Sequence, residues 1–141
     1  MENRLFIYGT LQPGERNVDR MEGVEPEGVA LTKEAVFTLA EFQSTHTPGQ
    51  VSPSVLEGGE ERIRGHLVMV SDELLKRLHD FEGPDYIPTL VELDDGKTAI
   101  MYLHNSKSDK EPHLPTATSP SGIVREDGIA RWSQPKQATP T

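Results

Sequence analysis

Hydrophobic residues recur at every second position in several short stretches of the chain, which is typical of β-strands that bury one face. A continuous apolar run over residues 5–8 ends at Gly9 and predicts a buried first strand. The alternating stretches predict further strands at 35–42, with 28–31 joined to it, at 64–70, at 86–93 and at 98–103. The last two flank an Asp-Gly pair, which is the signature of an antiparallel hairpin. The Ser-, Thr-, Pro- and Gly-rich residues 44–61 predict mostly loop, with one short strand at 54–57.

One segment changes to the spacing of an amphipathic helix. Its apolar residues share one helical face: Leu74, Leu75, Leu78 and Phe81. Ser71 precedes the segment as a helix N-cap, and acidic residues follow it in the first turn. Gly83-Pro84 cannot continue a helix. We therefore expect about three turns of helix that end at Glu82 or just before it.

The composition becomes polar after His104. Residues 105–122 are rich in Ser, Lys, Pro and Thr without apolar periodicity and predict a mobile loop or linker. Residues 123–132 predict a short element that docks back on the fold through Trp132, and residues 134–141 predict a disordered end. The expected organisation is therefore one domain at 1–104, followed by a polar loop and tail at 105–141 with a docking segment at 123–132.

Length and charge narrow the class of protein. A chain of 141 residues supports one hydrophobic core, and 14 Lys and Arg against 23 Asp and Glu argue against a nucleic-acid partner. The chain has no cysteine, so it has neither a disulfide nor a thiolate nucleophile. No stretch approaches ~18 consecutive apolar residues and no signal peptide is evident, so we expect a cytoplasmic protein with no membrane partner. The oligomeric state is left open.

The histidines do not follow metal-ligand spacing, and we expect surface or loop histidines and no metal site. They are His46, His66, His79, His104 and His113. A hydroxyl nucleophile is also disfavoured, because Ser54 lacks the G-x-S-x-G context.

The loop after the first strand has two glycines, Gly9 and Gly14, which match the first half of the sequence pattern of a phosphate-binding loop. The second half of that pattern requires Lys and then Ser or Thr, where this chain has Glu15 and Arg16. A carboxylate there would repel phosphates, which disfavours a nucleotide site. Two interpretations stay open, namely an ordinary strand-ending turn, or a turn whose backbone amides converge on a carboxylate or an oxyanion.

Glu82 is the candidate for acid and base catalysis. Its carboxyl emerges at the apolar end of the predicted helix, a setting that raises the pKa of a glutamate towards neutrality. Its neighbours Asp80 and Asp85 are expected to face solvent. Tyr86 either packs in the following strand with its hydroxyl at the rim or lines a site.

These segments together resemble the gamma-glutamylcyclotransferase-like family. The motifs that carry the resemblance are residues 5–11 followed by Gly14, then Gly65 and Ser71, then residues 78–86. They span roughly residues 4–103, and Trp132 is similar to a tryptophan near the C-terminal end of that family. The resemblance implies an α+β fold, a small mixed, mostly antiparallel β-barrel with flanking helices, and no metal or organic cofactor.

The resemblance also implies roles for residues. Glu82 corresponds to the catalytic acid and base, and Tyr86 completes the pocket wall. The residues that hold the γ-glutamyl moiety correspond to Tyr8, Gly9, Thr10 and Leu11. The implied reaction is attack of the α-amino group of a small γ-glutamyl substrate on its own γ-carbonyl, which releases 5-oxoproline and a free amine.

Two departures from the family leave the substrate open. Ile87-Pro88 stands where members often carry a basic residue, and the polar segment after His104 replaces structure that covers the pocket in relatives. The amine half could be an ε-linked lysine, an amino acid, a peptide as in glutathione, or a protected metabolite. Two alternatives to an enzyme are a non-catalytic module that binds small ligands on the same fold and a recognition segment in the tail.

Overall fold

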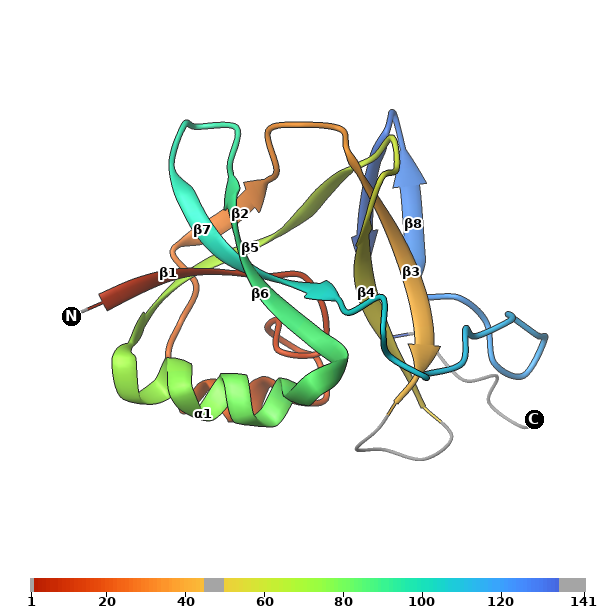
Figure 1. Cartoon of the computed structure of the whole chain (residues 1–141), viewed down its shortest axis with the longest axis horizontal. Helices are drawn as coiled ribbons and strands as arrows, with labels where there is room; N and C mark the ends of the chain where they lie inside the picture. Colours follow the sequence, from red (N-terminus) through yellow and green to blue (C-terminus); the bar gives the residue numbers. More distant parts are fainter. Residues whose placement is uncertain (1, 45–49, 135–141) are drawn as a thin grey trace.

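The computed structural model describes residues 2–44 and 50–134. His46 and most of the predicted C-terminal end therefore lie outside the described residues. Within them a nine-stranded mixed sheet curls into an almost closed barrel (Figure 1). The strands are β1 Glu2–Ile7, β2 Gly28–Leu31, β3 Phe37–Gln43, β4 Val51–Glu57, β5 Arg62–Ser71, β6 Tyr86–Glu92, β7 Thr98–His104, β8 Ile123–Glu126 and β9 Ile129–Trp132.

The strand order is β3-β4-β7-β1-β5-β9-β8, with β2 added to β5 and β6 added to β7. Five pairs are antiparallel, and the contacts of β1 with β7, β4 with β7 and β5 with β9 are parallel. A bridge between Thr32 and Leu93 brings the ends of β2 and β6 together. This topology confirms the predicted mixed, mostly antiparallel barrel and the hairpin of β6 and β7.

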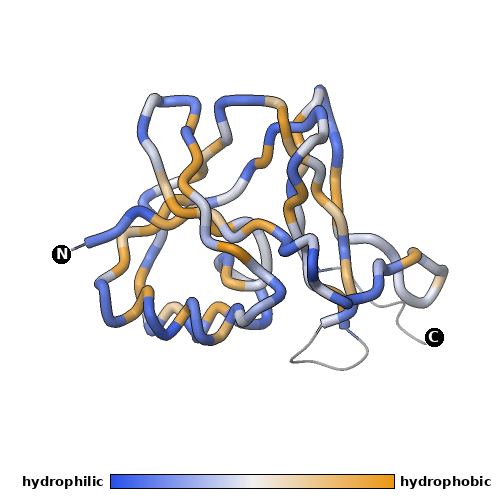
Figure 2. The backbone as a smooth tube through the Cα atoms, viewed as in Figure 1, coloured by the Kyte–Doolittle hydropathy of each residue, from blue (hydrophilic) through white to orange (hydrophobic). Residues whose placement is uncertain are grey.

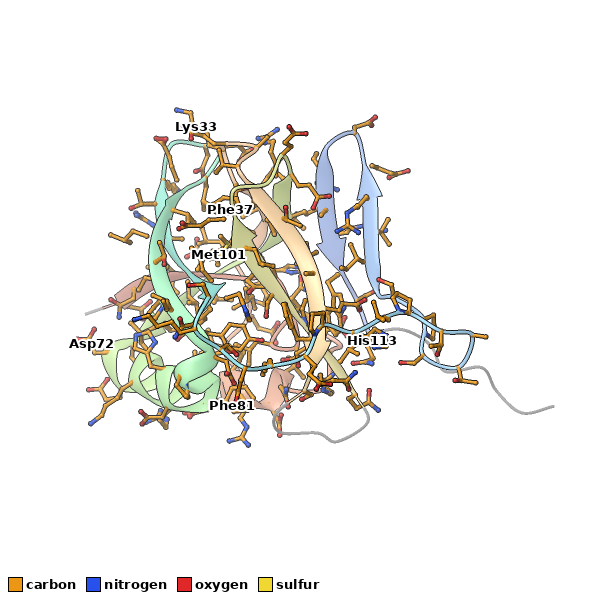
Figure 3. All side chains as sticks on the ribbon, turned by 45° about the vertical axis from the view of Figure 1, so that its right-hand side comes forward. Lys33, Phe37, Asp72, Phe81, Met101 and His113 are labelled. Carbon is orange, nitrogen blue, oxygen red and sulfur yellow. The ribbon has the colours of Figure 1, made fainter. Side chains whose placement is uncertain are left out.

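Residues 5–7 of β1 are buried because the strand lies between β5 and β7 with apolar side chains on both of its faces there. Phe6 belongs to the core inside the barrel, whereas Leu5 and Ile7 belong to a second core under the helix. Figure 2 shows these hydrophobic stretches crossing the centre of the molecule, with hydrophilic residues at the turns. Met101, fully buried on β7, lies inside the barrel, and Lys33 lies at its margin (Figure 3).

The predicted helix is α1, Asp72–Glu82. Its first turn is capped as expected, because the amide of Leu74 donates to Oγ of Ser71 at 3.1 Å. Leu74 and Leu78 bury one face against β1 and β5. Two short 3₁₀ helices, η1 Val18–Met21 and η2 Gly83–Asp85, complete the helical part of the described residues. No helix in residues 2–44 or 50–134 is long and apolar enough to cross a bilayer.

Two strand predictions are corrected. The short strand predicted at 54–57 is the longer β4, Val51–Glu57, which pairs with β3 over its whole length. Residues 28–31 form β2, but they pair with β5 and do not extend the strand at 37–43. Pairing of this kind depends on partners distant in sequence, which local periodicity does not report.

Residues 105–122 contain no strand or helix, yet they are attached to the barrel. Phe42 and Pro112 form a β-bridge, and the amide of Gln43 donates to the carbonyl of Glu111 at 3.2 Å. The hairpin of β8 and β9 then joins the sheet through β5. Trp132 on β9 is only 3% exposed, and its indole Nε1 donates to Oε2 of the buried Glu41 at 2.9 Å.

Candidate active site

A cavity opens where the end of β1, the end of α1 and the start of β4 meet. It is lined by all six residues that the sequence points to: Tyr8, Gly9, Thr10, Leu11, Glu82 and Tyr86. Sequence reasoning missed the other lining residues, which are Phe6, Ile7, Asn17, Ser44, Ser52, Pro53, Phe81, Tyr102 and Lys110. The two motifs, about seventy residues apart in the chain, therefore meet in one cavity.

Glu82 is the last residue of α1, and Gly83 with φ of 73° turns the chain away behind it. Burial raises the pKa of the Glu82 carboxyl from its usual 4.5 to about 7, and the charge of Lys110 opposes part of that rise. The carboxyl makes no hydrogen bond to any of the described residues. Glu82 is therefore free to take up and return a proton near neutral pH.

Gly9 lies so close to Pro53 that there is no room for a side chain at position 9. A Cβ at this position would lie 2.7 Å from Cγ of Pro53 on β4. The carbonyls of Gly9 and Thr10 accept from the amides of Gln12 at 3.1 Å and Asn17 at 3.0 Å, which fixes the loop. The N–H groups of Gly9, Thr10 and Leu11 donate to none of the described residues. The loop thus keeps donors available at the cavity.

The hydroxyls of Tyr8 and Tyr86 are already engaged. Tyr8 donates to the carbonyl of Tyr102 at 2.6 Å and accepts from the amide of Val55 at 3.3 Å. Tyr86 donates to the carbonyl of Pro53 at 3.3 Å and accepts from Oγ of Ser54 at 3.2 Å. Burial, with the charge of Glu82 adding to it, raises the pKa of both phenols far above the usual value. Both tyrosines therefore brace the cavity and contribute ring surface to it.

Tyr102 adds a third phenol beside Glu82. Its hydroxyl is hydrogen-bonded to Nδ1 of His79, and burial together with Glu82 raises its pKa. His79 packs edge-on against the Tyr102 ring, with ring centroids 5.4 Å apart. His79 lies in α1, His66 in β5 and His104 in β7, and all three are partly buried. The expectation of surface or loop histidines is therefore wrong for these three.

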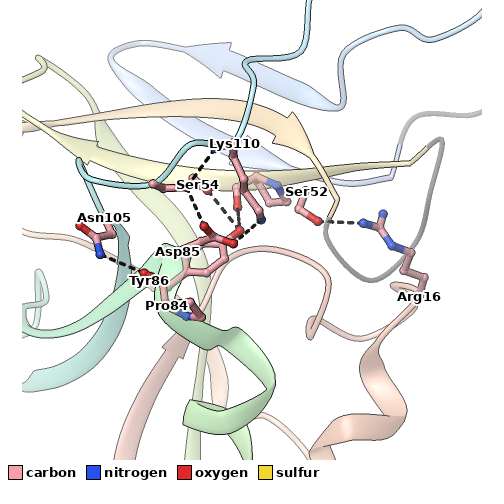
Figure 4. Close-up of polar contacts among 10 residues, drawn as sticks. Arg16, Ser52, Ser54, Pro84, Asp85, Tyr86, Asn105 and Lys110 are labelled. Carbon is pink, nitrogen blue, oxygen red and sulfur yellow. Dashed lines mark hydrogen bonds and ion pairs between the residues drawn. The ribbon is translucent and has the colours of Figure 1, made fainter.

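Asp85 holds the segment that follows β7. Its backbone carbonyl accepts from the amide of Asn105 at 2.8 Å, and its carboxylate accepts from Oγ of Ser108 at 2.7 Å. Nζ of Lys110 lies 3.9 Å from the same carboxylate and 5.0 Å from the centre of the Tyr86 ring (Figure 4). The side chain of Asp85 is only 19% exposed, so the prediction that it faces solvent is wrong, whereas Asp80 is exposed as expected.

Nothing in the sequence predicted that Lys110 lines the cavity. It lies in a polar stretch without periodicity, and it reaches the cavity only because residues 105–113 cross the end of β3. In Figure 1 this segment runs past the ends of β3 and β4, opposite β1 and α1. The part of the chain that was expected to be a linker therefore completes one wall of the cavity.

Solved structures share this fold. One is c4763, a protein specific to uropathogenic E. coli, which is 15% identical, with 79% of this chain and 87% of that chain covered and a TM-score of 0.65. PH0828, an uncharacterised protein from Pyrococcus horikoshii, is 19% identical over 79% of this chain and 85% of that chain, with a TM-score of 0.58. A gamma-glutamyl cyclotransferase is also 19% identical, over 79% of this chain and 70% of that chain, with a TM-score of 0.59. At these identities the likeness shows the fold alone.

Comparison with curated proteins finds no match. The sequence model of the family described as gamma-glutamyl cyclotransferase, AIG2-like, matches residues 5–121. That match includes the loop after β1, Glu82 and the segment that holds Lys110. The chain therefore belongs to the gamma-glutamyl cyclotransferase, AIG2-like family.

Proposed function

We propose that this protein is a cofactor-independent gamma-glutamyl cyclotransferase. It converts a γ-glutamyl amine or peptide into 5-oxoproline and a free amine by intramolecular cyclisation. The observation that carries this proposal is the position of Glu82, a carboxyl with a pKa of about 7 in the same cavity as the free amides of Gly9, Thr10 and Leu11. Membership of the family supports it.

The reaction needs one group that moves a proton twice. The Glu82 carboxylate accepts a proton from the α-ammonium of the substrate, and the resulting amine attacks the γ-carbonyl carbon. A carbon–nitrogen bond forms within a five-membered ring while the amide bond to the leaving amine breaks. Glu82 returns that proton to the leaving nitrogen, and the second proton that the ring nitrogen loses after the attack passes by the same carboxyl to the free amine, which leaves as its ammonium form. Atoms and charge then balance and no water is consumed.

The rest of the cavity positions the substrate. The nucleophile belongs to the same molecule as the carbonyl, so the protein accelerates the step mainly by selecting a rotamer in which the two meet. The amides of the loop are donors of the kind that stabilise a carboxylate or a developing oxyanion. Tyr8, Tyr86 and Phe81 line the cavity together with Glu82, and burial raises the pKa of the Glu82 carboxyl.

The products test this proposal against its alternatives. We expect the wild-type protein to release one 5-oxoproline for each free amine from at least one γ-glutamyl compound, measured by mass spectrometry. Release of glutamate in place of 5-oxoproline would mean hydrolysis by water and would contradict cyclisation. Binding of γ-glutamyl compounds without release of either product would favour a binding module on the same fold.

A further inference from the structure

The position of the Glu82 carboxyl is set by the end of α1. The carboxyl makes no hydrogen bond to any of the described residues, so its place in the cavity depends on where the last turn of the helix lies. Gly83 turns the chain away directly behind it. A contact that fixes this last turn against the barrel would therefore also fix the carboxyl.

His79 makes such a contact. It lies three residues before Glu82, so the two side chains are neighbours on the helix surface. Nδ1 of His79 is hydrogen-bonded to the hydroxyl of Tyr102 on β7, and the two rings pack edge to face with centroids 5.4 Å apart. The backbone carbonyl of His79 accepts from the amide of Gly83, which closes the same turn. His79 thus joins the last turn of α1 to a strand of the barrel.

Tyr102 is a well-fixed partner for this contact. It is only 5% exposed and belongs to the core under the helix, together with Leu78. Its backbone carbonyl accepts from the hydroxyl of Tyr8 at 2.6 Å. Tyr102 also lines the cavity that holds Glu82, and burial and then the charge of Glu82 raise the pKa of its phenol. The contact of His79 with Tyr102 therefore lies next to the carboxyl.

Two other contacts near the end of α1 reach a different part of the molecule. Arg77 forms an ion pair with Glu22 at 2.6 Å, in which the side chains are 55% and 47% exposed. Cζ of Arg20 lies 4.6 Å from the centre of the Phe81 ring. Both contacts tie the helix to η1 and the residue after it, and an exposed ion pair contributes at most about 1 kcal/mol. His79, by contrast, ties the helix to β7.

We propose that His79 is a positioning residue, which holds the last turn of α1 on β7 through the hydroxyl of Tyr102 and so sets the position of the Glu82 carboxyl in the cavity. The effect on turnover rests on the proposed function, whereas the position of the carboxyl is measurable without it. Loss of the hydrogen bond would let the helix end move and admit water to Glu82, which lowers its pKa. The carboxyl would then also meet a substrate in a less productive geometry.

Two substitutions of His79 separate the hydrogen bond from packing. His79→Asn keeps a polar atom as many bonds from the backbone as Nδ1, and His79→Leu keeps an apolar side chain without a hydrogen bond. The Glu82 carboxyl is titrated by carbon NMR in full-length protein with labelled glutamate, and its signal is assigned with Glu82→Gln. We expect the pKa of about 7 to be kept in His79→Asn and to fall by about one pH unit towards 4.5 in His79→Leu.

Turnover of γ-glutamylalanine is measured on the same proteins, after circular dichroism has shown that each is folded. We expect kcat of His79→Leu to fall about tenfold or more with little change in KM, because the loop after β1 is untouched. His79→Asn should keep most of kcat. Tyr102→Phe should lower kcat as far as His79→Leu does, with no further loss in the double variant. Arg77→Ala, which removes the exposed ion pair of the same helix, is the control and should change neither the pKa of Glu82 nor kcat.

Unchanged pKa and kcat in His79→Leu would overturn the inference, and so would a higher kcat in His79→Leu than in His79→Asn, because packing would then be what matters. A rise in the pKa of Glu82 in His79→Leu would mean that His79 acts through charge and would overturn it too. A lower pKa with unchanged kcat would show that the position of the carboxyl does not limit turnover, against the inference. If His79→Leu does not fold, Tyr102→Phe gives the same titration.

The titration separates this inference from the proposed function. If wild type forms no 5-oxoproline while the pKa of Glu82 falls in His79→Leu and is kept in His79→Asn, the positioning of Glu82 is upheld and only the proposed function is contradicted. If wild type forms 5-oxoproline and His79→Leu is as active as wild type, the proposed function stands and the role of His79 is contradicted.

Discussion

Position 82 shows how one side chain acquires its chemistry from its surroundings. Burial and the attraction of Lys110 act on the Glu82 carboxyl in opposite directions, and burial dominates, because the pKa rises to about 7. A carboxyl with this pKa is present in both protonation states near neutral pH. The same burial has a cost in stability, because the ionised form is poorly solvated in the folded protein.

Glu82→Gln is therefore expected to stabilise the protein at alkaline pH. The folded-state pKa of about 7 lies above the ordinary value of 4.5, so between these values the native state binds more protons than the unfolded state and stability falls as pH rises. The full shift corresponds to roughly 3 kcal/mol. The free energy of unfolding in urea should differ little between wild type and Glu82→Gln at about pH 4.5 and favour the variant increasingly up to about pH 8.

Asp80→Asn, an exposed acid on the same helix, is the control and should show no such trend. A difference between wild type and Glu82→Gln that stays constant with pH would contradict the raised pKa.

The candidate residues were predictable to the extent that they lie in local motifs. The position of Glu82 at an apolar helix end follows from the leucine spacing and from Gly83, both of which are local. Lys110 and Asp85 were not predictable, because the burial of each depends on where the segment at 105–110 folds. Contacts of that kind are set by the assembled barrel.

At the scale of elements, the conformation of the loop after β1 requires a glycine at position 9. Gly9→Ala would place a Cβ 2.7 Å from the ring of Pro53, which cannot rotate away, so the loop must move. We expect a loss of about 1–3 kcal/mol in the free energy of unfolding and a larger proportional loss of turnover. Gly28→Ala in β2, where a Cβ has no neighbour within 4 Å, is the matched control and should be nearly neutral. Full activity in Gly9→Ala would show that the position of this loop is unimportant.

The segment at 105–113 depends on Asp85. Asp85→Ala removes the acceptor of Ser108 and the partner of Lys110. Since the segment would then cover the cavity less well, we expect KM to rise several-fold, by about 3–10-fold, with a smaller change in kcat. Asp109→Ala, exposed in the same segment, should change neither constant. A fall in kcat with no change in KM would mean that Asp85 acts on the chemical step and not on binding.

The elements themselves follow from periodicity where their sequences are apolar. Strands β6 and β7 and helix α1 lie where the pattern predicts them, whereas β1 begins at Glu2, before the predicted apolar run at 5–8. Strand β4 was underestimated because Val51, Ser52 and Pro53 were predicted as loop, although Pro53 pairs with Glu41 of β3. A neighbouring strand can thus hold residues in a sheet that would not form a strand alone.

At the scale of the whole molecule, the C-terminal hairpin is tied to the site. The side chain of Gln12 donates to the carbonyl of Gly9 at 3.2 Å and to that of Trp132 at 3.0 Å, so the loop after β1 and β9 are linked directly. Trp132 in turn donates to Glu41 on β3. Strand β9 is therefore joined both to the loop that lines the cavity and to β3.

Trp132→Phe tests the contact with β3. The substitution leaves the buried Glu41 carboxylate with the amide of Gly122 as its remaining donor at 2.9 Å. We expect a loss of about 1–3 kcal/mol in the free energy of unfolding, the cost of an unsatisfied buried group. Val124→Ala on the exposed side of the hairpin should stay within about 0.5 kcal/mol of wild type. An equal effect of the two changes would show that the indole hydrogen bond contributes nothing.

The barrel as a whole was predictable from the combination of its motifs. What the sequence could not reveal was that residues after His104 line the cavity and that β9 pairs with β5, since the pairing of β9 with β5 and the bridge of Pro112 with Phe42 join segments more than sixty residues apart. Hydrogen bonds over such separations leave no periodic trace in the sequence.

The account depends most directly on the role of Glu82, which a comparison of 5-oxoproline formation by wild type and Glu82→Gln tests. Both proteins are assayed with γ-glutamylalanine near pH 7.5, after circular dichroism has shown that both are folded. We expect the variant to lose about 10²–10⁴-fold in rate, as is usual on removal of a general acid and base. A folded variant that forms 5-oxoproline at the wild-type rate would contradict the account.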